Sequence, residues 1–223
     1  MPYRSSIREE RARHTRREVL AAARVSFIDR GYAGTTMRMI AAGAGVSVPT
    51  VELLFGTKAA VLKATIDVAI AGDDEQIPVL DREWSVRARA AGDVPGLLTV
   101  VVGVLGAAQE RSAGLVLAAL EASITDRDLG VVSEQLVAQR AVTAGWIADQ
   151  VAARSPLRTG LTRADAVDTV WLLMDPAVFV RLTRHRDWSM PRYQDWMARS
   201  LRTLLVPDDL PTEPPTTSMP REG

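Results

Sequence analysis

The chain has 223 residues, of which 47% are hydrophobic and 24% charged, and its formal net charge is zero. This composition supports a buried core and excludes a wholly disordered or fibrous protein. Cysteine is absent and histidine occurs only twice, so disulfide frameworks, thiolate zinc sites and cysteine nucleophiles are excluded. The sequence therefore indicates no metal, no cofactor and no enzyme activity.

The zero net charge conceals an uneven distribution. Residues 1–65 hold eleven basic and five acidic side chains, whereas the remainder holds 16 basic and 22 acidic ones. This division indicates two tasks, the first of them contact with a polyanion, and a chance surface distribution is the alternative. The N-terminus is too charged for a signal peptide, and residues 94–108 are too short for a membrane helix of ~20 residues. We therefore expect a cytoplasmic protein with no membrane partner.

Helical periodicity dominates the first third of the chain. A first helix is expected to begin near Thr15, because Thr15 and Glu18 have the spacing of a capping box. It is expected to end at Gly31, since glycine accepts the left-handed conformation of a helix terminus. A short helix follows, capped by Thr35 or Thr36.

A second short helix comes next. Residues 45–47 predict a turn, and Ser47 can cap the helix after it. Gly56 is expected to break this helix, and Thr57 to cap a longer one that reaches residue 70. Two short helices joined by such a turn predict a helix-turn-helix unit. Its second helix would present an outward set of side chains: Val48, Pro49, Thr50, Glu52 and Leu53.

The rest of the chain predicts further helices. Residues 72–94 indicate a loop with a short helix, close to a domain hinge. Helical segments are then expected at 94–110, 113–125, 130–154, 163–185 and 190–205. From Pro207 onward, five of 17 residues are proline, which is typical of a disordered tail. Alternating β-branched runs are lacking, so the predicted fold class is all-α.

Four sequence strings in the first third form one specific pattern: residues 19–27 (VLAAARVSF), 31–41 (GYAGTTMRMIA), 44–51 (AGVSVPTV) and 55–58 (FGTK). Together they resemble the TetR family of bacterial transcriptional regulators. The resemblance implies an N-terminal three-helix DNA-binding domain with a basic arm, a C-terminal helical ligand-binding and dimerisation domain, and a tail. The corresponding boundaries are 1–57, 58–206 and 207–223.

The resemblance also implies a function. It predicts a homodimer that binds a palindromic operator in double-stranded DNA, acts as a repressor and is released by a small-molecule effector. The alternative is a stand-alone structural or compacting DNA-binding protein without an effector. A compacting protein would leave the large acidic helical part of the chain without a role.

Residues expected at the DNA follow from the same comparison: Arg38, Ser47, Val48, Pro49, Thr50, Glu52, Leu53 and Lys58. At position 52 the family commonly has an aromatic residue, so Glu52 is a departure. Its carboxylate can accept a hydrogen bond from a cytosine amino group, or it can point away or pair with an arginine. The neighbouring leucine can contact a thymine methyl group or pack inside.

Lys58 stands at the N-terminus of a helix, where free N–H groups favour an anion, so we expect it to clamp a phosphate. A solvated surface lysine is the alternative. The arginines between Arg4 and Arg17 can form a basic arm over the DNA backbone or in its minor groove. Because Glu9, Glu10 and Glu18 dilute that charge, a solvated segment is equally consistent with the sequence.

The C-terminal part predicts a pocket and a dimer interface. Aromatic and sulfur side chains around a proline suggest a ligand pocket of Trp146, Trp171, Met174 and Phe179, although such a stripe also occurs in cores. The apolar setting suggests an uncharged or weakly polar effector. Two apolar stripes predict a four-helix dimer interface, made by Val167, Val170, Trp171 and Met174 with Tyr193, Trp196, Met197, Leu201, Leu204 and Leu205.

Overall fold

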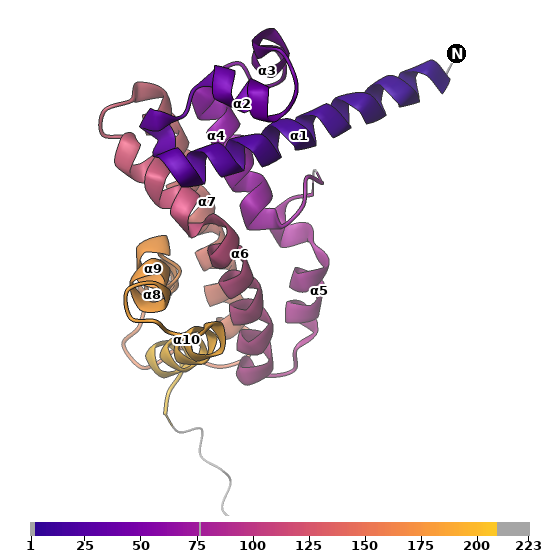
Figure 1. The fold of residues 1–223 in the computed structure, drawn as a ribbon. Coiled ribbons are helices and arrows are strands. Elements are labelled where there is room, and N and C mark those ends of the chain that lie inside the picture. Colours follow the sequence, from indigo (N-terminus) through magenta and orange to yellow (C-terminus); the bar gives the residue numbers. More distant parts are fainter. Residues whose placement is uncertain (1–2, 76, 209–223) are drawn as a thin grey trace, which may run out of the picture.

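The computed structural model describes residues 3–75 and 77–208, with side chains from residue 10 onward (Figure 1). These residues form ten α-helices and one 3-10 helix, and no strand occurs among them, which confirms the all-α prediction. The helices are α1 (Tyr3–Gly34), α2 (Met37–Gly43), α3 (Val48–Phe55), α4 (Lys58–Ala71), η1 (Val79–Asp81), α5 (Glu83–Ala90), α6 (Val94–Ala122), α7 (Arg127–Ala152), α8 (Arg163–Leu173), α9 (Pro176–Thr183) and α10 (Met190–Leu205).

The start of α1 differs from the prediction. The helix begins at Tyr3 and runs through Thr15, so the capping-box spacing lies inside the helix. The preceding residues are mostly arginine, glutamate and alanine, which favour helix and give no reason for a break. The predicted end at Gly31 is marked by a kink, where φ is 65°. Thr36 is the cap of α2, and Thr35 is buried, its hydroxyl donating to the carbonyls of Ser26 and Gly31 at 2.9 and 2.8 Å.

Two further helices differ from the predicted segments. The expected break between residues 110 and 113 is absent, and α6 is continuous because no residue there disrupts the hydrogen-bond ladder. The predicted helix 163–185 is instead divided into α8 and α9. Pro176 lacks an N–H, and the carboxylate of Asp175 accepts from Ala177 N at 2.7 Å, so a new helix starts there.

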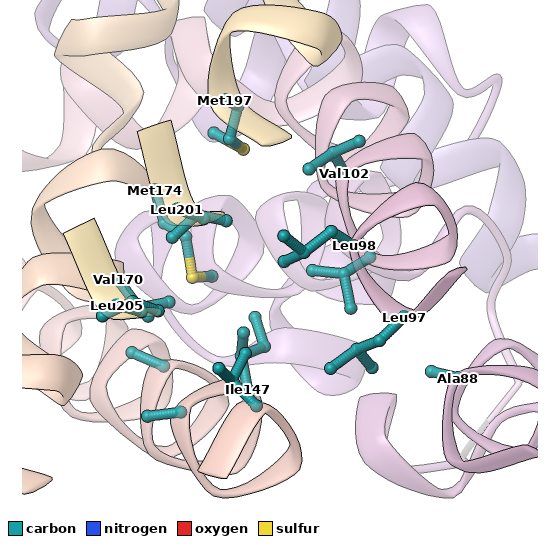
Figure 2. Close-up of a cluster of buried hydrophobic side chains, with 14 of the residues drawn as sticks. Ala88, Leu97, Leu98, Val102, Ile147, Val170, Met174, Met197, Leu201 and Leu205 are labelled. Carbon is teal, nitrogen blue, oxygen red and sulfur yellow. The ribbon is translucent and has the colours of Figure 1, made fainter. Parts of the chain in front are cut away.

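The apolar side chains form two cores. The upper core joins α1–α4 to the adjoining ends of α6 and α7. The lower core fills the space between α5, α6, α7, α8, α9 and α10 (Figure 2). Helix α4 thus shares a core with the three helices before it, and the domain boundary predicted between residues 57 and 58 stays a prediction. The disorder predicted for residues 207–223 falls almost wholly outside the described residues.

Helix α10 corrects the predicted dimer interface. Tyr193, Met197, Leu201 and Leu205, at spacings of four, are fully buried and pack in the lower core, where α10 lies against α6. Figure 2 shows three of them facing α6 side chains of the same chain. Val170 and Met174 of α8 are also buried there. The burial predicted for this apolar stripe is confirmed, but α6 of the same chain covers it and not a second chain.

Helix α6 is, by length and composition, apolar enough to cross a membrane, as is the bent pair α2–α3 taken together. Its position in the fold accounts for this character. It contacts α1, α4, α5, α7, α9 and α10, so apolar side chains are needed on several of its faces.

Arg154 offers a test of how the lower core is held. Its guanidinium donates to the carbonyls of Ala88, Arg89 and Ala91 at 2.8–3.0 Å and so completes the C-terminus of α5. We expect Arg154→Ala to lower the free energy of unfolding by about 2–3 kcal/mol, because partly buried carbonyls lose a charged donor. Urea denaturation measures this. The exposed pair of Arg199 with Asp195 provides the control, since Arg199→Ala should change stability by less than about 0.5 kcal/mol.

Candidate nucleic-acid interface and internal cavity

Helices α2 and α3 meet at an angle of 106°. Gly45 in the turn between them has a φ of 66°, a conformation that favours glycine. Ile40 of α2 and Val51 of α3 are fully buried, and with Phe27 of α1 they fix the crossing. The geometry is that of a helix-turn-helix, as predicted.

The N-terminus of α3 is capped in the predicted way. The hydroxyl of Ser47 accepts from Thr50 N at 3.3 Å and contacts the Thr50 hydroxyl at 2.8 Å. Pro49 occupies the first turn, where a missing N–H costs nothing. The first turn of α3 is therefore well ordered and solvent-facing, with its free N–H groups available to an anion.

The outer surface of α3 consists of residues that were predicted to face outward. Glu52 and Pro49 are exposed, Leu53 is 88% exposed, and Val48 and Thr50 are half-buried. Arg38 is exposed on α2. In Figure 1, α3 lies at the top of the molecule, away from α8–α10. The outward side of α3 is therefore open to a partner.

The structure bears on the alternatives for Glu52. Within the described part of the chain, no arginine or lysine lies within 4 Å of its carboxylate. Arg16 of α1 instead lies over the ring of Phe55, with its guanidinium carbon 4.6 Å from the ring centre. Glu52 is therefore not paired with an arginine among the described residues, and the residue is exposed on the outward side of α3.

Lys58 has partners that the sequence did not reveal. Its ammonium group donates to the carbonyls of Tyr32 and Thr35 at 2.9 and 3.0 Å, and it lies 3.9 Å from the centre of the Tyr32 ring. Burial lowers the pKa of the Lys58 ammonium group, and Asp126 opposes that shift. Lys58 thus completes the C-terminus of α1. With two N–H groups on carbonyls, one remains for a phosphate, so the phosphate clamp stays a prediction.

The basic arm is part of a helix. The N-terminal portion of α1 projects from the body of the molecule in Figure 1. Arg11, Arg13 and Arg17 are exposed on it, whereas Arg16 is half-buried. Arg4 and Arg8 lie on this helix, but their side chains are outside the described residues. A helical arm is wider than the extended segment that a narrow minor groove admits, which favours contact with the backbone.

A cavity of about 720 Å³ lies between α4, the segment 72–82, α6 and α7. Its apolar wall includes Ile70, Val79, Leu80, Val104, Leu105, Val116, Leu120, Leu136 and Met174. Four arginines and four acidic residues also line it: Arg16, Arg82, Arg111, Arg140, Asp67, Asp73, Asp74 and Glu75. Cavities of this size and character bind small molecules.

The segment 72–82 is held over the cavity by Arg82. This guanidinium binds both carboxylate oxygens of Asp73 and the carbonyls of Glu75 and Ile77. The Arg82 guanidinium beside Asp73 holds the pKa of that carboxyl below its ordinary value. The cavity wall is therefore built into the fold.

The cavity shares little of its lining with the predicted pocket. Of the four predicted residues only Met174 lines it. Trp146 packs edge-on against Trp84, and Phe179 packs edge-on against Tyr193 in the lower core. Trp171 carries the guanidinium of Arg140 at 3.9 Å from its ring centre. These contacts are those of packing, the alternative interpretation of the stripe, but Phe179 also lines a smaller cavity of about 270 Å³, so the predicted ligand pocket stays a prediction.

Sequence reasoning missed the residues that do line the cavity. The signal was present in two helices rich in alanine, valine and leucine, because Arg111 and Arg140 interrupt them. An arginine within such a helix must find carbonyls, carboxylates or a ligand. No group of three histidine, aspartate or glutamate side chains in the described part of the chain is placed to hold a metal ion.

A capped and outward-facing α3 on a helix-turn-helix, with a cavity in the helical body behind it, defines a class of protein. It is the class of DNA-binding transcription regulators that carry their own small-molecule cavity.

Comparison with known proteins finds a family match in the DNA-binding part of the chain. Residues 19–65 match the model for bacterial regulatory proteins of the tetR family. The matched residues include α2 and α3, and the fold of the chain is that of solved TetR-family transcription regulators. No curated protein matches the sequence.

Solved structures share this fold at low sequence identity. NalD, the secondary repressor of the MexAB-OprM multidrug efflux pump in Pseudomonas aeruginosa, has a TM-score of 0.66 and 19% identity, covering 89% of this chain and 99% of its own. FadR from Bacillus subtilis, a transcriptional regulator in complex with stearoyl-CoA, has a TM-score of 0.65 and 15% identity, covering 82% and 96%. A regulator from Rhodococcus sp. assigned to the TetR family has a TM-score of 0.64 and 13% identity, and the match covers 86% of this chain and 99% of that one.

Lys58→Ala tests both roles of this lysine. We expect a loss of about 1–3 kcal/mol in the free energy of unfolding, because two carbonyls of α1 lose their donor. We also expect the slope of log affinity for DNA against log salt to fall by about 1.8, since a dimer loses two phosphate contacts.

Lys63→Ala is the matched control on the same helix, since Lys63 pairs with Asp67 at 2.6 Å. It should leave the slope unchanged. A less stable Lys58→Ala protein with the parent's salt slope would show that Lys58 completes α1 and touches no phosphate.

Proposed function

We propose that this protein is a homodimeric repressor that binds a palindromic operator in double-stranded DNA and is released by a small molecule in the cavity. One observation carries the proposal: α4 belongs to both sites. Its first turn follows α3 directly, and Val61, Leu62 and Ile66 pack in the upper core. Farther along the same helix, Ala64, Val68 and Ala71 line the cavity. A ligand that moves α4 therefore moves α3.

Arg111 strengthens the connection between the cavity and α4. Its guanidinium lines the cavity and donates to the carbonyls of Ala69 and Ile70 at 2.8 and 3.1 Å, at the end of α4. A ligand that contacts Arg111 shifts the hydrogen bonds that hold α4 against α6. Coupling of ~1–3 kcal/mol by such a contact changes operator affinity by ~5–150-fold.

The solved relatives support the same proposal. FadR is a transcriptional regulator in complex with stearoyl-CoA, and NalD is a repressor. The match covers 96% of FadR and 99% of NalD, so this chain has the DNA-binding part and the helical part of such proteins. We accordingly expect it to act in the cytoplasm, where its operator is.

The dimer is proposed on different residues from those first expected, since most of the predicted interface is buried in the lower core. Helices α8, α9 and α10 lie together on one side of the molecule in Figure 1. Leu172 is 59% exposed and Leu204 47% exposed on this side, and Trp196 is half-buried. These side chains are only partly covered by their own chain and suit a two-fold interface.

A footprint tests the proposal against the compacting alternative. We expect protection of one palindrome in promoter DNA, with two reading helices about 34–36 Å apart or farther if the DNA bends. The protein should sediment at twice the 24.2 kDa of one chain. A monomer at micromolar concentration, or protection of random DNA to the same extent as promoter DNA, contradicts the proposal.

Glu52 is expected to read a base. Glu52→Ala should relax the preference at one base pair in each half-site by about 1–3 kcal/mol and leave the salt slope unchanged, because the carboxylate acts on sequence and not on charge neutralisation. Titration of the operator and its single-base variants at several salt concentrations measures both quantities. Glu134→Ala on α7, also exposed, is the control and should alter neither. Retention of every base preference in Glu52→Ala would contradict base reading.

A further inference from the structure

Two residues of the cavity wall carry buried hydrogen-bond donors without partners among the described residues. Four buried side-chain nitrogen or oxygen atoms have no hydrogen-bond partner in the described part of the chain, and two of them belong to cavity-lining residues: Nε of Arg140 and Nε1 of Trp84. Both are donors. Trp84 is only 9% exposed, and the side chain of Arg140 is only 14% exposed. Leaving such groups unpaired is costly, which indicates a ligand that brings acceptor oxygens.

Arg140 has more unused hydrogen-bond donors than Trp84. A guanidinium has five N–H groups, and among the described residues only one of them is used, in a 2.8 Å hydrogen bond from Nη1 to Asp175. Trp171 covers one face of the group at 3.9 Å. The guanidinium is thus held in place at the cavity wall and has most of its donors free. This fork matches the geometry of a carboxylate.

The acidic residues of the cavity do not supply that carboxylate. Asp73 is bound by Arg82, Asp67 pairs with Lys63, and Asp74 lies 3.8 Å from Arg17. Arg111, on the α6 wall, donates to carbonyls, and no carboxylate lies within 4 Å of it in the described part of the chain. Arg140 on the α7 wall therefore has Asp175 as its one carboxylate partner, Arg111 on the α6 wall has none within the described residues, and Asp67, Asp73 and Asp74 are engaged with other cations.

We propose that the cavity binds an amphipathic carboxylate, with an apolar chain or ring system in the cavity and its carboxylate on the guanidinium of Arg140. The apolar body fits between Leu105, Val116 and Leu136. This inference rests on the proposed function only in naming the effector, and it replaces the sequence-based expectation of an uncharged one.

The carboxylate of Asp175 competes with such a ligand for the guanidinium of Arg140. One oxygen of its carboxylate accepts from Arg140, and the other caps α9 through Ala177 N at 2.7 Å. Asparagine at this position keeps the capping oxygen and removes the charge. Asp175→Asn should therefore leave α9 intact and free the guanidinium for a ligand.

Calorimetric titration of the full chain without DNA tests the proposal. The probes are octanoate and 2-naphthoate, each compared with its uncharged counterpart, 1-octanol or 2-naphthol, and with octylammonium as the cationic arm. We expect at least one carboxylate to bind roughly ten- to a hundredfold more tightly than its counterpart. Octylammonium should bind no better than 1-octanol.

Variants assign the preference to Arg140. Arg140→Gln should abolish the carboxylate preference and leave alcohol binding unchanged, which also reports an intact cavity. Arg140→Lys should keep part of the preference. Asp175→Asn should tighten carboxylate binding severalfold. Arg199→Gln is the control for the loss of one positive charge, since Arg199 is exposed, pairs with Asp195 outside the cavity and should leave the preference unchanged.

Several results would overturn the inference: equal affinity for carboxylates and alcohols, no carboxylate binding at millimolar concentration, or an unchanged preference in Arg140→Gln. Operator affinity, measured separately by fluorescence anisotropy, keeps the two proposals apart. Carboxylate binding through Arg140 without any change in operator affinity would defeat the effector role and support the ligand class. Operator release by the alcohols but not by the carboxylates would support the effector role and defeat the ligand class.

Discussion

The fold depends on how its helices end. The last carbonyls of a helix have no partner within it, and a buried helix end must find donors elsewhere. Here a cation from a distant part of the chain meets four such ends. Lys58 binds carbonyls at the end of α1, Arg111 at the end of α4, Arg154 at the end of α5 and Arg158 at the end of α10. Each contact also satisfies the negative end of a helix dipole.

These four contacts decide what the functional parts can do together. Two of them bracket α4: its own first residue is bound to α1, and its last turn is bound by α6. The position of α3 relative to the cavity is therefore set by hydrogen bonds at both ends of one helix. The other two fix α5 and α10 against the lower core at the far side of the molecule.

The predictable parts of the molecule are those with local signals. Glycine at a positive φ and a hydroxyl at a helix start depend on neighbouring residues alone, so Gly45, Ser47 and Thr57 were placed correctly. Thr15 shows the limit of such local signals. Where helix propensity continues on both sides, capping-box spacing does not mark the start of a helix. The helix-turn-helix and the outward side of α3 followed from such signals together with the family resemblance.

The parts that failed depend on distant packing. An amphipathic stripe shows that a partner exists but not which one, so the stripe of α10 was assigned to a second chain when α6 covers it. The residues that line the cavity were not predicted for the same reason. Its walls come from α4 with the segment after it, from α6 and from α7, which are far apart in sequence, and the aromatic residues that suggested a pocket pack against other side chains. Only the arginines within apolar helices pointed to it, through the cost of burying their charge.

The continuity of α6 has a mechanical consequence. A helix of 29 residues is about 44 Å long at 1.5 Å per residue. Its lower half is embedded in one core and its upper half in the other, with the cavity alongside. A tilt of about 5° at the lower end would displace the upper end by about 4 Å. A break near residue 111 would have absorbed that rotation in a hinge, whereas an unbroken rod delivers it to α4 as displacement.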